Sequence, residues 1–524
     1  MPQSLMHYTL LALAVFIGFF LNLGGAPLFD LDEGAFSEAT REMFVRGDFI
    51  SPFVNGAPRF DKPVLIHWLQ AASMSLFGVT PFAFRLPSAL AATGWVLLTY
   101  AFVARVIDRE TALRAALMLS AALGIMVIGR AATADALLNL WLAAAMFGIY
   151  LYFLERKKRW ILLTHAAMGL GFLTKGPVAL LIPGAVGLIF FAMQRELPAL
   201  LRAAFYPPGL LLLIGIPLPW YILQFQAQGM AFIDGFFGTH NVERFGGSME
   251  GHAGSLFYYL PVALLLALPF TTPLLRAVGA LRQEIKNPLG LYLWLWFGFV
   301  LVFFSLSGTK LPHYLNYGMT AAMILAALAL PLLKSEQLGS RALALLPPLL
   351  FFGLLAPIPC LLPEIISRMP ENDARALLIG AVDLFPTGYF TVFFLLAVTS
   401  LALMFVQSLS LGLSLLGLAL AGNFALALFF LPALGAIQQG PIAHAAQLAQ
   451  QLPGPYVMWR VNTPSYSVHS GHVQDLREPR AGDLVFTRSK EISALPPHTI
   501  LMNERGYSLV RVHPSVQPSE KSHE

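Results

Sequence analysis

Residues 409–431 read LSLGLSLLGLALAGNFALALFFL, a stretch without a single charged side chain. As an α-helix, it is long enough to cross a hydrocarbon core of about 30 Å. Similar apolar stretches recur along the chain, in which 57% of residues are hydrophobic and only 12% are charged. A soluble domain carries roughly 25% charged residues. The sequence therefore predicts an α-helical polytopic membrane protein.

Hydropathy predicts about thirteen transmembrane helices. No Lys or Arg precedes the first apolar stretch and no cleavage site follows it, so we interpret it as an uncleaved helix rather than a signal peptide. The thirteen helices are expected at residues 8–24, 85–104, 113–129, 135–154, 160–174, 178–193, 207–223, 256–275, 289–305, 314–333, 342–360, 386–405 and 409–431.

Short basic loops set the expected orientation of these helices. Positively charged loops are retained in the cytoplasm. The connections after the second, fourth, sixth, eighth and tenth predicted helices are such loops, which places the N-terminus inside and the C-terminus outside. The basic loops are residues 105–114, 155–159, 194–202, 276–286 and 334–341.

The C-terminal part of the chain differs in composition. GPYVMWRV (454–461), GDLVFTRS (482–489) and YSLVRVH (507–513) are typical of strands, and Pro and Gly separate them. We therefore expect a transmembrane domain over 1–437, with an outer loop at 25–80, and a small soluble α/β domain over 438–524. The single cysteine excludes an internal disulfide, and the basic residues form no stripe that would bind nucleic acid.

Ionisable residues in or near membrane segments are costly and therefore candidates for function. In the predicted topology, six separate segments bring such residues to the outer face. This convergence favours one site built from many loops. The residues are Asp32, Glu33, Asp61, Lys62, Arg130, Asp135, Lys175, His240, Glu243, Arg244, Lys310 and His313.

Two of these segments supply the candidate catalytic carboxylates. In LDEGAFSEATREM (31–43), Asp32 is either a general base or the cap of a helix, and Glu33 is expected beside it at the substrate. In GRAATADALL (129–138), Asp135 begins a predicted span and is a candidate catalytic residue. The alternative for Asp135 is a favourable interaction with the helix dipole.

Three other segments supply cations. Lys62 precedes Pro63 and either contacts a phosphate or reaches out of the membrane to the lipid interface. Lys175 lies at a Gly-Pro break, and such breaks at membrane depth line cavities. Lys310 and Tyr314 lie at a helix start interrupted by proline. A buried anion there would gain from the lysine charge and the helix N-terminus.

The polar loop GTHNVERFGG (238–247) holds a His and a Glu three residues apart. Two such ligands are a weak indication of a divalent metal, and a hydrogen-bonded loop histidine is favoured on the residues alone. Carboxylates together with several cations suit group transfer from a donor whose leaving group is a lipid phosphate. A carboxylate would deprotonate the acceptor hydroxyl, and cations would stabilise the departing phosphate.

These motifs, in this order, resemble the membrane glycosyltransferases of the GT-C fold, in particular the lipid A aminoarabinose transferase and protein O-mannosyltransferase group. The resemblance covers residues 8 to 330 well. It rests on LDEGAFSEATREM, FDKPVLIHWL, TADALL, LTKGPVALLIPG, HNVERFGG and SGTKLPHYL. It implies an inverting transfer from a polyprenyl (undecaprenyl) phosphate sugar at the periplasmic face of the bacterial inner membrane.

The resemblance also implies roles for individual residues. Asp32 matches the proposed base, and Asp135 matches an acidic residue that lines the site. Asp61 and His240 match positions that can hold a divalent metal ion, which is the only cofactor expected. Residues that match contacts to the donor phosphate are Lys62, Arg244 and Tyr314.

One motif departs from the family pattern. Ala35 and Phe36 stand where an Arg-Tyr pair often follows Asp-Glu, so the sugar or the acceptor is expected to differ from aminoarabinose and lipid A. Lipid A remains the leading candidate among lipid and glycan acceptors, and a protein acceptor is the alternative within the same enzyme class. A lipid or sugar transporter is the alternative class. It is disfavoured because the polar residues gather at one face rather than at the midplane.

Overall fold

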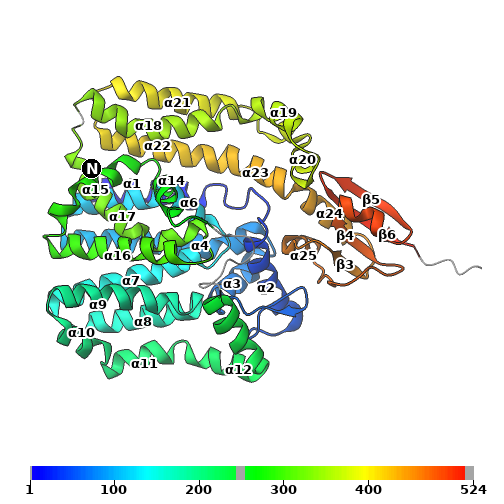
Figure 1. The fold of residues 1–524 in the computed structure, drawn as a ribbon, viewed down its shortest axis with the longest axis horizontal. Helices are drawn as coiled ribbons and strands as arrows, with labels where there is room; N and C mark the ends of the chain where they lie inside the picture. The colour runs from blue at the N-terminus through cyan, green and yellow to red at the C-terminus, as the bar shows by residue number, and fades with distance from the viewer. Residues whose placement is uncertain (1–2, 244–253, 335, 514–524) are drawn as a thin grey trace, which may run out of the picture. The chain divides into compact units, whose positions relative to one another are not determined.

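The computed structural model describes residues 3–243, 254–334 and 336–513. They form two compact units, shown in Figure 1. The first unit consists of residues 1–23, 60–357 and 388–428, and the second of residues 24–59, 358–387 and 429–524. The structure therefore divides the chain differently from the sequence analysis, because residues 24–59 group with the C-terminal part rather than with the transmembrane helices.

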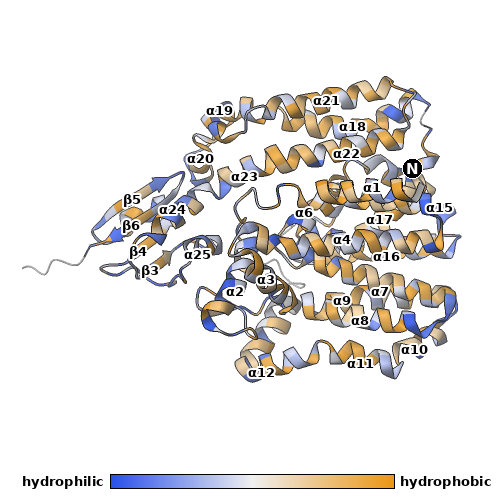
Figure 2. Ribbon diagram, turned by 180° about the vertical axis from the view of Figure 1, so that it is seen from behind, coloured by the Kyte–Doolittle hydropathy of each residue, from blue (hydrophilic) through white to orange (hydrophobic). Residues whose placement is uncertain are grey.

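The first unit is almost entirely helical, and Figure 2 shows hydrophobic residues along most of its helices. Its helices are α1 (Gln3–Val15), α3 (Leu65–Phe77), α4 (Pro81–Val106), α5 (Arg109–Ala121), α6 (Leu123–Arg130), α7 (Asp135–Glu155), α8 (Lys158–Lys175), α9 (Val178–Met193), α10 (Leu197–Ala204), α11 (Pro207–Gly215), α12 (Leu218–Ile233), α14 (Tyr259–Leu266), α15 (Thr271–Glu284), α16 (Pro288–Leu306), α17 (Asn316–Ala329), α18 (Leu338–Leu355), α21 (Tyr389–Phe405) and α22 (Leu411–Ala425). Short π or 3-10 turns are η1 (Phe16–Phe20), η2 (Asp234–Glu243), η3 (Pro312–Leu315), η4 (Leu330–Leu332) and η6 (Leu426–Phe430).

Seven helical segments of the described chain are long and apolar enough to cross a membrane, or eight if α5 and α6, bent by 61°, form one span. Three shorter apolar helices, at 5–20, 178–193 and 389–405, coincide with further predicted spans. Two predicted spans remain. α8 covers the first as a continuous helix, whereas the segment predicted at 256–275 is broken into α14 and α15. The protein is therefore a multi-span helical membrane protein.

Close contacts at small residues and hydrogen bonds of buried indole N–H groups hold these helices together. A Cβ added at Gly171 would lie 2.7 Å from the Cβ of Ala179, so α8 and α9 approach closely there. Buried indole groups are paired across the unit: Trp95 donates to the Thr320 hydroxyl at 2.8 Å, and Trp296 donates to the Tyr317 carbonyl at 2.7 Å. Such pairs avoid the cost of an unsatisfied donor in an apolar interior.

The second unit combines helices with a four-stranded sheet of order β3-β4-β6-β5. β3 and β4 are parallel, and the remaining pairs are antiparallel. Its elements are α2 (Asp32–Arg46), β1 (Phe53–Val54), β2 (Ala57–Pro58), α19 (Ile358–Arg368), α20 (Asp373–Leu378), η5 (Ala381–Leu384), α23 (Leu431–Gln438), α24 (Gly440–Gln450), β3 (Tyr456–Trp459), α25 (Pro464–Ser470), β4 (Leu484–Arg488), η7 (Ser489–Ala494), β5 (His498–Glu504) and β6 (Tyr507–Val512).

Alternating residues of this sheet are buried on both faces. On one face, Met458 and Phe486 pack with Ala445 of α24. On the other face, Val457 and Val485 form a second apolar cluster. The period of two along each strand explains this division, and the predicted α/β character of the C-terminal part is present.

Candidate functional site

Asp135, at the first turn of α7, is the centre of a buried polar cluster in the first unit. Only 5% of the residue is exposed. Its Oδ1 accepts a hydrogen bond from Lys175 Nζ at 2.6 Å and another from the Tyr317 hydroxyl at 2.8 Å. Its Oδ2 accepts one from the Thr133 hydroxyl at 3.2 Å, and His313 Nε2 lies 3.8 Å from Oδ1. The carboxylate is therefore engaged by donors from three separate segments.

Lys175, the last residue of α8, contributes the cation of this cluster. Gly176 follows it with φ +82°, a conformation that ends the helix. The Lys175 ammonium also lies 5.5 Å and 5.8 Å from the ring centroids of Tyr317 and Tyr314, within the range of cation–π attraction. An ammonium carries three N–H donors, and among the described residues Lys175 donates to Asp135 alone. The cluster thus holds a cation with donors left for an anion.

Lys310 and His313 precede α17, as the sequence analysis expected. Lys310 is buried and donates to the carbonyls of Ser307 at 2.6 Å and Ser305 at 3.0 Å. His313 packs edge to face on Tyr314, with ring centroids 4.8 Å apart. Asp135, Lys175, His313 and Tyr314 therefore gather in one place, although they are widely separated in sequence.

Lys62 and Asp61 lie just before α3. Lys62 Nζ donates to the Asp61 carbonyl at 2.9 Å and lies 3.6 Å from its carboxylate. Both side chains are half-buried. Arg244 and the His240 side chain lie outside the described residues. Among the described residues, no three His, Cys, Asp or Glu side chains converge as metal ligands, so the predicted Asp61–His240 metal site stays a prediction.

Asp32 and Glu33 belong to the second unit, at the first turn of α2. Asp32 is exposed, whereas only 5% of Glu33 is exposed. Glu33 accepts a hydrogen bond from the Phe29 N–H at 2.9 Å. The helix N-terminus stabilises a carboxylate at either position. The two acids therefore differ, because Asp32 faces solvent and Glu33 turns back onto the preceding loop.

Three features of the structure were not predicted from the sequence. Tyr317 follows Tyr314 by three residues, a spacing that puts both on one helical face and could have identified it. Arg130 was grouped with the site, yet it donates to the carbonyls of Leu21 at 2.6 Å and Gly18 at 3.4 Å, so it caps the end of the first helix. The third feature is a buried ion pair in α2 between Glu38 and Arg41, which no pattern in the sequence indicates.

Comparison of the sequence with known proteins places the chain in a family. Residues 61–222 match the family described as dolichyl-phosphate-mannose-protein mannosyltransferase. An uncharacterised protein of Aquifex aeolicus is 33% identical over 60% of this chain and 71% of its own length. An undecaprenyl phosphate-alpha-4-amino-4-deoxy-L-arabinose arabinosyl transferase of Aeromonas salmonicida is 37% identical over 63% of this chain. The chain belongs to the GT-C membrane glycosyltransferases.

Solved structures agree with this GT-C assignment at the level of the fold. ArnT from Cupriavidus metallidurans, solved with bound undecaprenyl phosphate, superposes with a TM-score of 0.81 at 20% identity and covers 97% of this chain and 98% of its own. The Archaeoglobus fulgidus oligosaccharyltransferase superposes with a TM-score of 0.51 at 13% identity, over 90% of this chain and 65% of its own. This GT-C protein spans 62% of the length of the Aeromonas relative that it matches.

Proposed function

We propose that the protein transfers one sugar from undecaprenyl phosphate to an acceptor at the periplasmic face of a bacterial inner membrane. The observation that carries the proposal is the buried cluster of Asp135, Lys175 and Tyr317, in which the Lys175 ammonium donates to Asp135 alone within the described part of the chain. A lipid phosphate is an anion suited to such a cation. The Aeromonas relative is named for transfer from undecaprenyl phosphate, which supports the same class of donor.

In the proposed reaction, the Asp32 carboxylate removes the proton of an acceptor hydroxyl. The hydroxyl oxygen then forms a bond to the anomeric carbon of the sugar, with inversion. The bond between that carbon and the phosphate oxygen breaks, and the electron pair leaves with undecaprenyl phosphate. Phosphate is a good leaving group when its charge is stabilised, so no strong general acid is needed. We assign this stabilisation to Lys62, Lys175, Arg244, Lys310 and Tyr314.

Asp135 has a different task in this proposal. Its hydrogen bonds from Lys175, Tyr317 and Thr133 suit a residue that orients the phosphate-binding side chains. Glu33 is proposed to support the loop before Asp32 through its hydrogen bond from Phe29. A divalent cation at Asp61 and His240 is a further part of the proposal, and it would add positive charge near the phosphate.

Lipid A is the proposed acceptor, because the sequence motifs resemble those of the lipid A aminoarabinose transferases and the Aeromonas relative is named as an aminoarabinose transferase. A protein acceptor is the second candidate, favoured by the match of residues 61–222 to a protein mannosyltransferase family. The replacement of the Arg-Tyr pair by Ala35 and Phe36 supports a different sugar from aminoarabinose.

Mass spectrometry of lipid A and of polyprenyl-phosphate sugars, from cells with and without the protein, tests the proposal. Loss of a sugar from lipid A in deleted cells, with accumulation of its lipid-linked donor, is the expected result and names the sugar. Donor accumulation with unchanged lipid A would redirect the acceptor to protein or another glycan. Unchanged pools of both, in cells that make the protein, would contradict the transferase function and favour transport.

A further inference from the structure

The loop before α2 is held by residues far along the chain, within the second unit. The Asp30 carboxylate accepts a hydrogen bond from the Ser465 N–H at 2.9 Å and another from the Ser465 hydroxyl. With its amide oriented to satisfy both partners, Gln439 donates to Asp30 Oδ2 and accepts from the Asp30 N–H, each at 3.1 Å. The main chain and the side chain of Asp30 are thus both fixed, two residues before Asp32.

Gly34 makes this close approach possible. A Cβ placed there would lie 2.7 Å from the Ser465 nitrogen and would also overlap Asp30 Oδ1. The first turn of α2 therefore packs directly against the start of α25. A side chain at position 34 would push the Asp30 carboxylate away from its partners, because backbone atoms cannot yield as a flexible side chain does.

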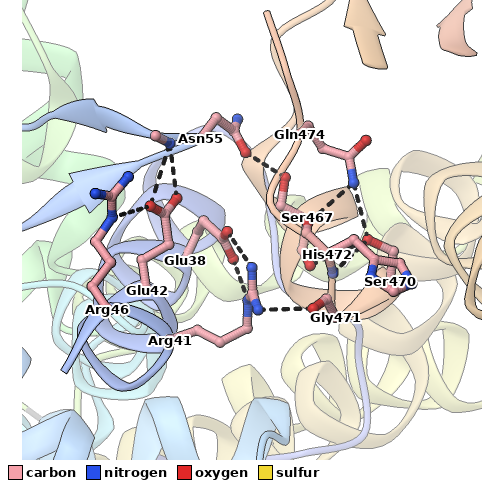
Figure 3. Close-up of polar contacts among 11 residues, drawn as sticks. Glu38, Arg41, Glu42, Arg46, Asn55, Ser467, Ser470, Gly471, His472 and Gln474 are labelled. Carbon is pink, nitrogen blue, oxygen red and sulfur yellow. Dashed lines mark hydrogen bonds and ion pairs between the residues drawn. The ribbon is translucent and has the colours of Figure 1, made fainter. Parts of the chain in front are cut away.

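Two further contacts join α2 and the β1–β2 turn to α25 and the residue that follows it (Figure 3). Arg41 donates to the Gly471 carbonyl at 2.9 Å while it pairs with Glu38 through two bonds of 2.7 Å. The Ser467 hydroxyl donates to Asn55 Oδ1 at 2.6 Å. The contacts at residues 30, 41 and 55 lie before, within and after α2, and each has a partner in α25 or directly after it. The position of α2 in the second unit is therefore set by α25 and the residue that follows it.

We infer that Ser465 and Gln439 are positioning residues for Asp32. Through them, the C-terminal part of the chain sets the orientation of the Asp32 carboxylate, the proposed catalytic base. The inference rests on the proposed function. A base must lie within hydrogen-bond reach of the proton it removes, and a displacement of about 1 Å costs about 10²-fold in rate. Asp32 itself is exposed, so its direction depends on the backbone that Asp30 anchors.

Ser465→Ala tests the inference, with Ser508→Ala as the matched control. Both serines are fully buried in the same unit, but Ser508 bonds to Ser489 and Asn503 instead of the loop before α2. The assay uses lipid-linked sugars extracted from cells lacking the protein. Ser465→Ala should lower the saturated rate at least about tenfold and change the half-saturating donor concentration less than about twofold, since a misdirected base leaves donor binding intact.

Hydrogen exchange of the amides at residues 29–34 supplies a readout independent of turnover. It should be faster in Ser465→Ala than in Ser508→Ala. A second variant, Gly34→Ala, should reproduce both the slower transfer and the faster exchange. Equal saturated rates in the two serine variants, with the wild type active, would overturn the inference alone. A wild-type protein that transfers no sugar from these extracts would refute the proposed function and, with it, the role given to Ser465.

Discussion

Two buried ion pairs, one in each unit, show how similar charges serve different purposes. In the first unit, Lys175 meets Asp135 through one hydrogen bond and lies near two tyrosine rings. In the second unit, Arg41 meets Glu38 through two parallel bonds and gives a third to a backbone carbonyl. The planar guanidinium thus donates to three acceptors, whereas among the described residues the ammonium donates to one. The proposed function makes the first pair a binding element, and the contacts of the second are those of a structural pair.

Breaking the second pair should give the largest change in stability. Glu38→Ala leaves the buried Arg41 guanidinium without its counter-charge, which typically costs about 3–5 kcal/mol. The thermal midpoint of unfolding in detergent measures this loss. Glu155→Ala, which removes the acid that pairs with the exposed side chains of Arg105, Lys157 and Arg159, is the control and should have a small effect. Equal midpoints for the two variants would contradict a structural role for the Glu38–Arg41 pair.

Neutralising both members of the first pair should separate folding from activity. In the double variant Asp135→Asn, Lys175→Met, no uncompensated charge is buried, so the protein should fold. Transfer should fall by about 10²-fold, equal to about 2.7 kcal/mol of transition-state stabilisation. Rates in vesicles, normalised to folded protein, measure this. Activity near that of the wild type would mean that Lys175 holds no phosphate.

The pH dependence of stability offers a third test, confined to the second unit. Burial raises the pKa of Asp30 from 3.8 to about 7. Between these values the folded state binds a proton that the unfolded state has released, so the contribution of Asp30 to stability is greatest at low pH and is lost as pH rises through 7. Asp30→Asn should therefore flatten the fall in thermal midpoint between pH 5 and pH 7. An unchanged slope would show that Asp30 does not titrate in this range.

A smaller effect is expected for the contact at Asn55, in the turn between β1 and β2. Ser467→Ala removes one buried hydrogen bond to Asn55 and should cost about 1 kcal/mol. Asp32 lies at the first turn of α2, whereas Asn55 follows the end of that helix. Transfer should therefore stay within about twofold of the wild type. Thermal unfolding and the transfer assay, run together with Ser465→Ala, measure both. A rate as low as that of Ser465→Ala would mean that any loosening of the loop slows transfer.

Much of the fold could be predicted from the sequence, because one uninterrupted apolar stretch such as residues 409–431 is enough to indicate a membrane helix. The gathering of Asp135, Lys175 and Tyr314 was also predictable, since span ends at one face must come close. The grouping of residues 24–59 with the C-terminal part was not. It depends on contacts such as that of Asp30 with Ser465, which lie 435 positions apart. A single serine in the sequence does not indicate which distant residue it will contact.

The most direct test of the central claim is the rate of sugar transfer by Asp32→Asn. This substitution keeps the size of the side chain and removes the base. Asp48→Asn is the matched control, because Asp48 lies in the same unit and accepts the Ile50 N–H at 2.8 Å at a turn beyond α2. We predict a fall of at least about 10²-fold for Asp32→Asn and little change for Asp48→Asn. A rate for Asp32→Asn within a few-fold of the wild type would remove Asp32 as the base and contradict the proposed mechanism.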